Sequence, residues 1–178
     1  ILTWNSVSVI SASGMNIPKV DLEKVRETRL SLHNTERATK KLTPFTYNAS
    51  LEKTATTWAK YLAHSGKTKW LHKRKNTDPT YSYDNIKQWF LDQWVVFAEN
   101  EWTLFSESIG RNFYSCNKTD CTDDFIKAIK KTRSLFMSEK PFGPHYHAIV
   151  GNFSDIWLGV VLVGKKYYLV THYTQALK

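Results

Sequence analysis

The chain is short of cysteine, of acidic residues and of long apolar runs. Its 178 residues include two cysteines, and 16 acidic residues stand against 25 basic ones. The longest apolar run, residues 156–163, is far too short to span a bilayer. Residues 1–17 lack the basic region and the apolar core of a secretory signal peptide. We therefore expect no transmembrane segment.

Four common enzyme signatures are also missing. The chain has neither of the glycine-rich phosphate-binding loops, G-x-x-x-x-G-K-[ST] and G-x-G-x-x-G. It has neither the H-E-x-x-H of metalloproteases nor the G-x-S-x-G of serine hydrolases. The chemistry that remains is that of histidine and glutamate side chains.

The excess of basic residues gives a net charge of +9. Such a charge favours anionic partners such as lipid headgroups or acidic glycans. The sequence contains no recognised nucleic-acid-binding module, so we expect no specific nucleic-acid partner.

What is present suits one folded domain. Apolar residues make up 42% of the chain and aromatic residues 14%, which is typical of a globular protein and argues against disorder. Residues 1–20 are polar and aperiodic, so we expect a tail or linker there and a single, monomeric domain over residues 21–178.

Helical periodicity is clearest in two early stretches. The first begins near Asp21, which can cap it, and runs to about residue 39. The second places its apolar residues at helical spacing over 51–62 and stops at Gly66. Either Asn48 or Ser50 can cap this second helix.

The later part of the chain changes from helical to strand patterns. A third helix is predicted over residues 84–94, and a fourth starts at Thr122, a capping hydroxyl followed by two acidic residues. Residues 156–163 and 167–173 then form two β-rich runs joined by a short turn, which predicts a hairpin. Both runs are apolar at consecutive positions, so we expect a sheet covered on both faces in a layered α and β domain.

The two cysteines bracket a short polar loop, CNKTDC. One pair does not supply the four ligands that a structural zinc ion usually takes. A local disulfide between Cys116 and Cys121 is the simpler interpretation, and it would imply an oxidising compartment. Two reduced thiols are the alternative.

Six segments together resemble a known family, and their order and spacing are specific. They are LHNTERA (32–38), FTYNASLEKTATTWAKYLAHSG (45–66), FSESIG (105–110), FMSEK (136–140), PHYHAIV (144–150) and YYLVTHY (167–173). Across residues 21–178 they resemble the CAP superfamily, which comprises cysteine-rich secretory proteins, antigen-5 allergens and pathogenesis-related proteins. Because the many disulfides of animal and plant members are missing, the resemblance favours a bacterial exported relative.

The resemblance implies a fold and a site. The fold is an α/β single-domain three-layer α-β-α sandwich with a mixed, largely antiparallel sheet and an open central cleft. In this family two histidines and two glutamates converge at the cleft floor, and some members hold a divalent metal there. The matching residues here are His72, Glu107, Glu139 and His145. Of these, His72 and His145 would bind a metal such as zinc, and the glutamates would either bind it as well or orient the histidines.

Several other residues compete for these roles. Glu99 is a rival of Glu107, because Gly-Glu-Asn of the family has become Ser-Glu-Ser. His172 lies in THYTQ, which looks like a family motif, but it falls on the last strand and is interpreted as a decoy. We interpret His147 as lying off the site on a short helix, and His33 as structural.

The resemblance favours a secreted or surface-attached protein that acts as a non-enzymatic binding module. Its ligand would be a lipid, a sterol or an anionic cell-surface molecule. The alternative is a metal-dependent hydrolase or protease, in which the bound metal activates water and Glu107 or Glu139 is the general base. A third possibility is a structural surface domain with an idle cleft.

Overall fold

A computed structural model describes residues 18–69, 71–74, 89–93, 95 and 105–175 of the chain. The elements are α1 (Leu22–Thr39), β1 (Thr46–Tyr47), the 3-10 turn η1 (Ala49–Leu51), α2 (Glu52–Ser65), β2 (Phe105–Phe113), α4 (Thr122–Met137), α5 (Pro144–Val150), β3 (Asp155–Val163) and β4 (Lys166–Thr174). Of the predicted helix at 84–94, residues 89–92 are helical, and most of the remainder lies outside the described residues. No described helix is both long enough and apolar enough to cross a membrane.

The first two helices begin and end where the sequence predicts. The Asp21 side chain accepts a hydrogen bond from the backbone N–H of Lys24 and so caps α1. Asn48 caps the short η1 turn that leads into α2. Gly66 ends α2 with a φ of 63°, a left-handed conformation that glycine adopts without strain.

The start of α4 differs from the prediction in one detail. Thr122 is the first helical residue rather than the cap, and its hydroxyl accepts a hydrogen bond from the backbone N–H of Asp21. The side chain of Asp120 instead accepts from the Thr122 backbone N–H. Thr122 therefore joins the first turns of α1 and α4, a contact between residues 101 positions apart that local sequence does not reveal.

The four strands form one mixed sheet in the order β1-β3-β4-β2. β1 pairs with β3 in parallel, while β3–β4 and β4–β2 are antiparallel. β3 and β4 are the predicted hairpin. Its two-residue turn begins at Gly164 with a φ of 57°, which favours glycine at that position.

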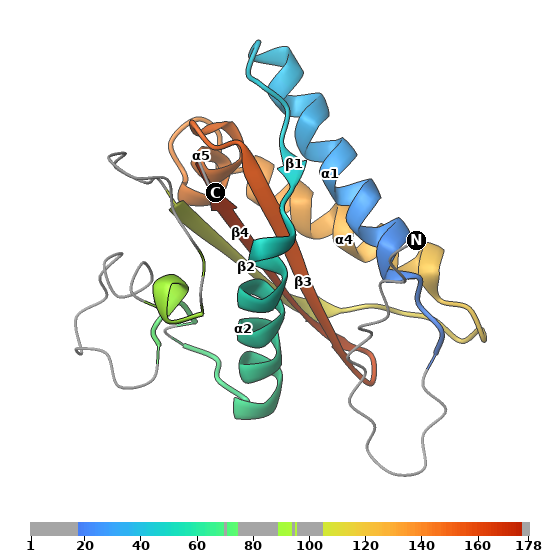
Figure 1. Ribbon diagram of the computed structural model, residues 1–178. Coiled ribbons are helices and arrows are strands. Elements are labelled where there is room, and N and C mark those ends of the chain that lie inside the picture. Colours follow the sequence, from blue (N-terminus) through green and yellow to red (C-terminus); the bar gives the residue numbers. More distant parts are fainter. Residues whose placement is uncertain (1–17, 70, 75–88, 94, 96–104, 176–178) are drawn as a thin grey trace, which may run out of the picture.

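Helices cover both faces of the sheet, as the apolar pattern of the hairpin predicts (Figure 1). α2 packs on one face, and Gly159 of β3 allows its close approach, since a Cβ there would collide with the backbone of Ala55. α1 and α4 pack on the other face, with Val25, Phe125 and Ile129 fully buried. The three-layer sandwich is therefore confirmed.

Two polar features fix the connections around this core. Arg37 of α1 donates hydrogen bonds to the carbonyls of Thr43, Ile149, Gly151 and Phe153 and so holds α5 and the following loop. His33 is fully buried and its Nε2 lies 3.3 Å from the Tyr173 hydroxyl, as expected of a structural histidine. At the other end of the domain Cys116 and Cys121 form the predicted disulfide.

Candidate functional site

Glu107 is a fully buried carboxylate on β2 that receives four hydrogen bonds. Its Oε1 accepts from His72 Nδ1 at 2.9 Å and from Arg74 Nη1 at 3.0 Å. Its Oε2 accepts from Arg74 Nη2 at 2.6 Å and from His172 Nε2 at 2.7 Å. A carboxylate offers about four lone-pair positions, so the hydrogen-bonding capacity of Glu107 is fully used.

Strand register and ring stacking position the donors. His172 of β4 is the cross-strand partner of Glu107, so the two side chains emerge on the same face. The Arg74 guanidinium lies against two indole rings, 3.8 Å from the centroid of Trp58 and 4.4 Å from that of Trp89. Arg74 thus links α2, the segment at 71–74 and the helical residues 89–92 to the sheet.

The charges of this cluster are fixed by its surroundings. Burial by itself would raise the pKa of the Glu107 carboxyl, but the positive charge of Arg74 and the hydrogen bonds of the donors outweigh it. The pKa is held well below its ordinary value. Burial lowers the pKa of His172, and this effect exceeds the opposing one of Glu107. His172 is therefore neutral at pH 7, with its proton on Nε2 and with Nδ1 2.9 Å from the Thr54 hydroxyl.

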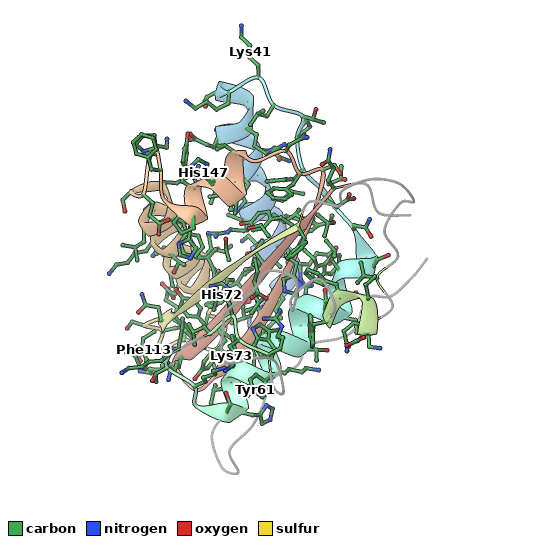
Figure 2. All side chains as sticks on the ribbon, turned by 90° about the vertical axis from the view of Figure 1, so that its left-hand side faces the viewer. Lys41, Tyr61, His72, Lys73, Phe113 and His147 are labelled. Atoms are coloured by element: carbon green, nitrogen blue, oxygen red, sulfur yellow. A yellow bond between two sulfur atoms is a disulfide. The ribbon has the colours of Figure 1, made fainter. Side chains whose placement is uncertain are left out.

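His72 is the partly exposed member of the cluster, with 30% of its side chain accessible. Figure 2 shows it near the middle of the molecule. Because Glu107 is ionised, Nδ1 of His72 carries the proton that forms their hydrogen bond. In the neutral ring the lone pair is then on Nε2, one of the two nitrogens through which histidines bind metals.

Glu139, just after the end of α4, and His145, in the first turn of α5, form a second pair. Glu139 Oε1 accepts from His145 Nδ1 at 2.6 Å, and Oε2 accepts from the His145 backbone N–H at 2.9 Å. The His145 ring stacks on Phe136 with the ring centroids 4.1 Å apart. Gly143 is required here, because a Cβ would overlap the Glu139 side chain. Both side chains remain about a quarter to a third exposed.

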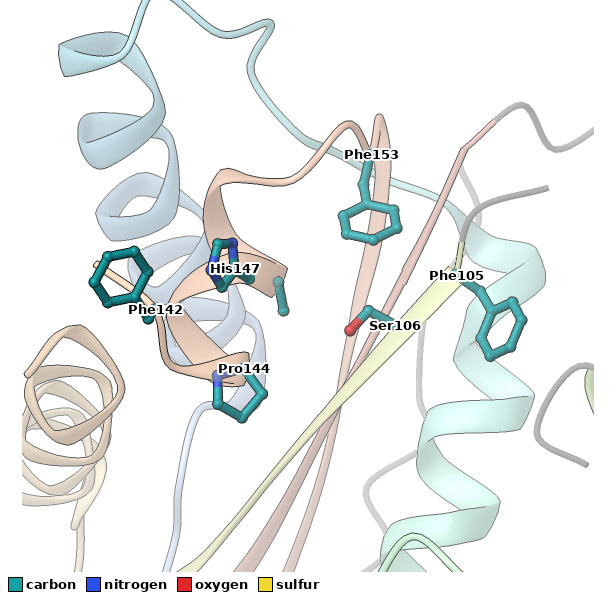
Figure 3. Close-up of a pocket in the computed structure, with 7 residues that line it drawn as sticks. Phe105, Ser106, Phe142, Pro144, His147 and Phe153 are labelled. Atoms are coloured by element: carbon teal, nitrogen blue, oxygen red, sulfur yellow. The ribbon is translucent and has the colours of Figure 1, made fainter. Parts of the chain in front are cut away.

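A pocket of about 410 Å³ opens between the start of β2 and α5 (Figure 3). It is lined by Phe105, Ser106, Phe142, Pro144, His147, Ala148 and Phe153. Ser106 precedes Glu107 in sequence and Pro144 precedes His145, so the pocket adjoins the backbone of both pairs. Its walls are apolar and largely aromatic, with one hydroxyl and one imidazole, which is typical of a small-molecule site.

Among the four predicted residues the structure shows two separate pairs, His72 with Glu107 and His145 with Glu139. Within the described ranges, no three His, Cys, Asp or Glu side chains are grouped so that they could hold a metal ion. In each imidazole the proton is on Nδ1, so Nε2 is the nitrogen that would bind zinc. Glu107 does not fit as a direct ligand, because its lone pairs accept hydrogen bonds from the protein. The metal role of His72 and His145 stays a prediction.

Four further residues bear on the sequence interpretation of the site, and the structure describes three of them. His172 is not a decoy: it donates to Glu107, and only the strand register reveals this. His147 lies on the predicted short helix, α5, and lines the pocket. Glu99, the rival of Glu107, lies outside the described residues. Arg74 escapes sequence reasoning altogether, since its place in a basic run, KTKWLHKRK, is typical of a solvated loop.

Comparisons with known proteins agree with this fold. The model of the CAP family, described as the cysteine-rich secretory protein family, matches residues 30–176. Among solved structures, an outer surface protein from Borrelia burgdorferi is 15% identical with a TM-score of 0.61, covering 91% of this chain and 99% of its own. NaASP2, solved with Zn²⁺, is 17% identical with a TM-score of 0.50, covering 85% of this chain and 79% of its own. No match is found among curated proteins. The chain therefore belongs to the CAP family of cysteine-rich secretory proteins.

Proposed function

We propose that the chain is a non-enzymatic binding module that takes an apolar ligand, a lipid or a sterol, into the pocket between β2 and α5. The aromatic walls formed by Phe142 and Phe153 carry this proposal. Phe142 is 85% exposed, an unusual environment for a large apolar side chain. The Ser106 hydroxyl and the His147 imidazole would orient the polar group of the ligand.

The state of Glu107 argues against the form of the hydrolase alternative in which Glu107 is the general base. A general base works best with a pKa near the operating pH and needs a lone pair directed at its substrate. The pKa of Glu107 is held well below its ordinary value, and all its lone pairs face donors of the protein. Glu107 is therefore suited to orient His72 and not to accept a proton.

A divalent ion such as zinc is part of the same proposal, with His72 and His145 as its nitrogen ligands. Glu107 and Glu139 would act through the rings by accepting the Nδ1 protons, which fixes the tautomer and raises the basicity of Nε2. Water would complete the coordination.

We further propose that the protein works as a monomer outside the cytoplasm, secreted or at the cell surface. The Cys116–Cys121 disulfide supports an oxidising compartment. The structural similarity to an outer surface protein agrees with this location but shows the fold alone.

Binding of a fluorescent long-chain fatty acid, with cholesterol as competitor, tests the pocket. We expect saturable binding that weakens about ten-fold in Phe142→Ala, because the ring loses the apolar contact it makes with the ligand. Phe113→Ala is the matched control. It removes an exposed phenylalanine from the opposite end of β2 and should leave the Kd unchanged.

Two outcomes would contradict the proposal. The first is an equal loss of affinity in Phe113→Ala and Phe142→Ala, which would show nonspecific adsorption. The second is hydrolysis of the matching fatty-acid ester that disappears in His145→Ala, which would favour the metal hydrolase.

A further inference from the structure

At the end of the sheet opposite the pocket, the last paired residues of β2, β4 and β3 lie at the surface. Lys166 of β4 pairs in register with Val163 of β3 on one side and with Phe113 of β2 on the other. Two residues further into the sheet on each strand, Val161 and Tyr168 lie in the core under α2, so Val163 and Lys166 point to the same face. Phe113 is 68% exposed and Val163 is 36% exposed. An apolar pair therefore flanks a lysine where the sheet extends past its covering helix.

Further basic residues lie close to these three residues. The Lys166 ammonium lies 5.9 Å from the ring centroid of Phe113. Arg111, two residues before Phe113 on the same face, donates to the carbonyl of Lys67 at 3.0 Å. Lys67 Nζ in turn donates to the carbonyl of Lys73 at 2.9 Å. We call this surface the basic end, made of Lys67, Lys73, Arg111, Phe113, Val163 and Lys166.

The charge of the basic end is not neutralised locally. Within the described part of the chain, none of its four cations forms an ion pair, whereas Lys24, Lys118 and Lys127 each pair with an aspartate. Burial, and after it the nearby charges of Lys73 and Arg74, lower the pKa of Lys67. Figure 2 shows Phe113 and Lys73 at the same end of the molecule, away from His147 and Lys41.

An exposed aromatic ring among cations without ion-pair partners fits one kind of partner closely. At an anionic bilayer the cations approach lipid phosphates while the ring enters the boundary between headgroups and acyl chains. An acidic glycan would use the cations but offers nothing to Phe113 and Val163. We propose that the basic end docks the protein onto the surface of a bilayer that contains anionic lipid.

This docking orients the pocket. Phe113 and Phe105 are the two ends of the nine-residue strand β2. With Phe113 at the bilayer, the pocket beside Phe105 faces away from it. The inference does not rest on the proposed function, because the two sites use different residues at opposite ends of the strand.

Co-sedimentation with vesicles tests the proposal on the full chain. Vesicles of phosphatidylcholine alone are compared with vesicles containing phosphatidylglycerol. We expect binding to the anionic vesicles only, weakened roughly ten-fold by Phe113→Ala and roughly five-fold by Lys166→Gln. Leu135→Ala and Lys41→Gln, which change an exposed leucine of α4 and an exposed lysine elsewhere, should bind as the unchanged protein does.

Heparin in a parallel titration distinguishes the glycan. Binding to anionic vesicles that falls in Lys166→Gln but not in Phe113→Ala, together with tight heparin binding, would overturn the bilayer in favour of an acidic glycan. Equal binding to both kinds of vesicle would also overturn it. Circular dichroism confirms that each variant is folded, and the fatty-acid assay reports the pocket independently.

Discussion

The two His–Glu pairs have the same contact between the side chains and different surroundings. In both, a carboxylate oxygen accepts the Nδ1 proton of a histidine, at 2.9 Å for Glu107 and 2.6 Å for Glu139. Glu107 is fully buried and also binds Arg74 and His172. Glu139 is 30% exposed, and its second oxygen binds the backbone N–H of His145.

Because of this difference, we expect the Glu107 cluster to stabilise the fold and the Glu139 pair to contribute little to stability. The Glu107 cluster joins the sheet, α2 and the helical residues 89–92, so its charges are part of the folded core. The Glu139 pair holds one ring beside the pocket and joins only neighbouring residues. Similar family motifs can therefore mark a structural cluster in one place and an adaptable one in another.

Breaking the buried cluster should have the largest effect. Arg74→Met leaves the Glu107 carboxylate buried without its cation, which typically costs about 3–5 kcal/mol of unfolding free energy. Glu139→Gln keeps an acceptor for the His145 ring at a partly exposed position and should cost less than about 1 kcal/mol. Urea unfolding measures both. Similar losses in the two variants would refute the distinction between the pairs.

The buried cluster should also give stability a pH dependence. The folded-state pKa of His172 is lowered, while the unfolded chain binds a proton near the ordinary value of 6.5. Stability is therefore complete above pH 6.5 and falls as the pH drops from there towards the folded-state pKa. One proton contributes a slope of at most about 1.4 kcal/mol per pH unit.

His172→Gln should flatten this part of the stability profile, measured by urea unfolding between about pH 7.5 and 5, the range around the ordinary histidine pKa. His64→Gln is the control, since His64 is exposed and its ring contacts the Lys60 carbonyl of its own helix. A profile that stays as steep in His172→Gln as in the unchanged chain would show that His172 is not buried in a neutral form.

Local signals were sufficient to predict most of the fold. Asp21 and Gly66 mark helix ends through backbone hydrogen bonding and positive φ, and the two apolar runs at 156–173 predict a covered hairpin. The spacing of Cys116 and Cys121 predicts their disulfide. In each case the interacting residues lie close in sequence.

The rest of the site depends on contacts between distant residues. His172 reaches Glu107 across 65 positions, through a strand register that no local pattern fixes. The sequence around Arg74 indicates a solvated residue, and only the folded chain brings Trp58 and Trp89, from two separate elements, around it. The Thr122 hydroxyl serves α1 rather than its own helix for the same reason.

The smallest expected effect tests most directly whether protein side chains alone build the binding site. The Kd of the fluorescent fatty acid is measured for the unchanged chain with and without EDTA, and for His72→Ala and His145→Ala. We expect the Kd to stay within about two-fold in all four cases, because the apolar walls of the pocket supply the affinity. Calorimetry with zinc should find its binding abolished in both variants, since each removes one of two nitrogen ligands. A loss of fatty-acid binding on adding EDTA, restored by zinc, would contradict a pocket that binds without a metal.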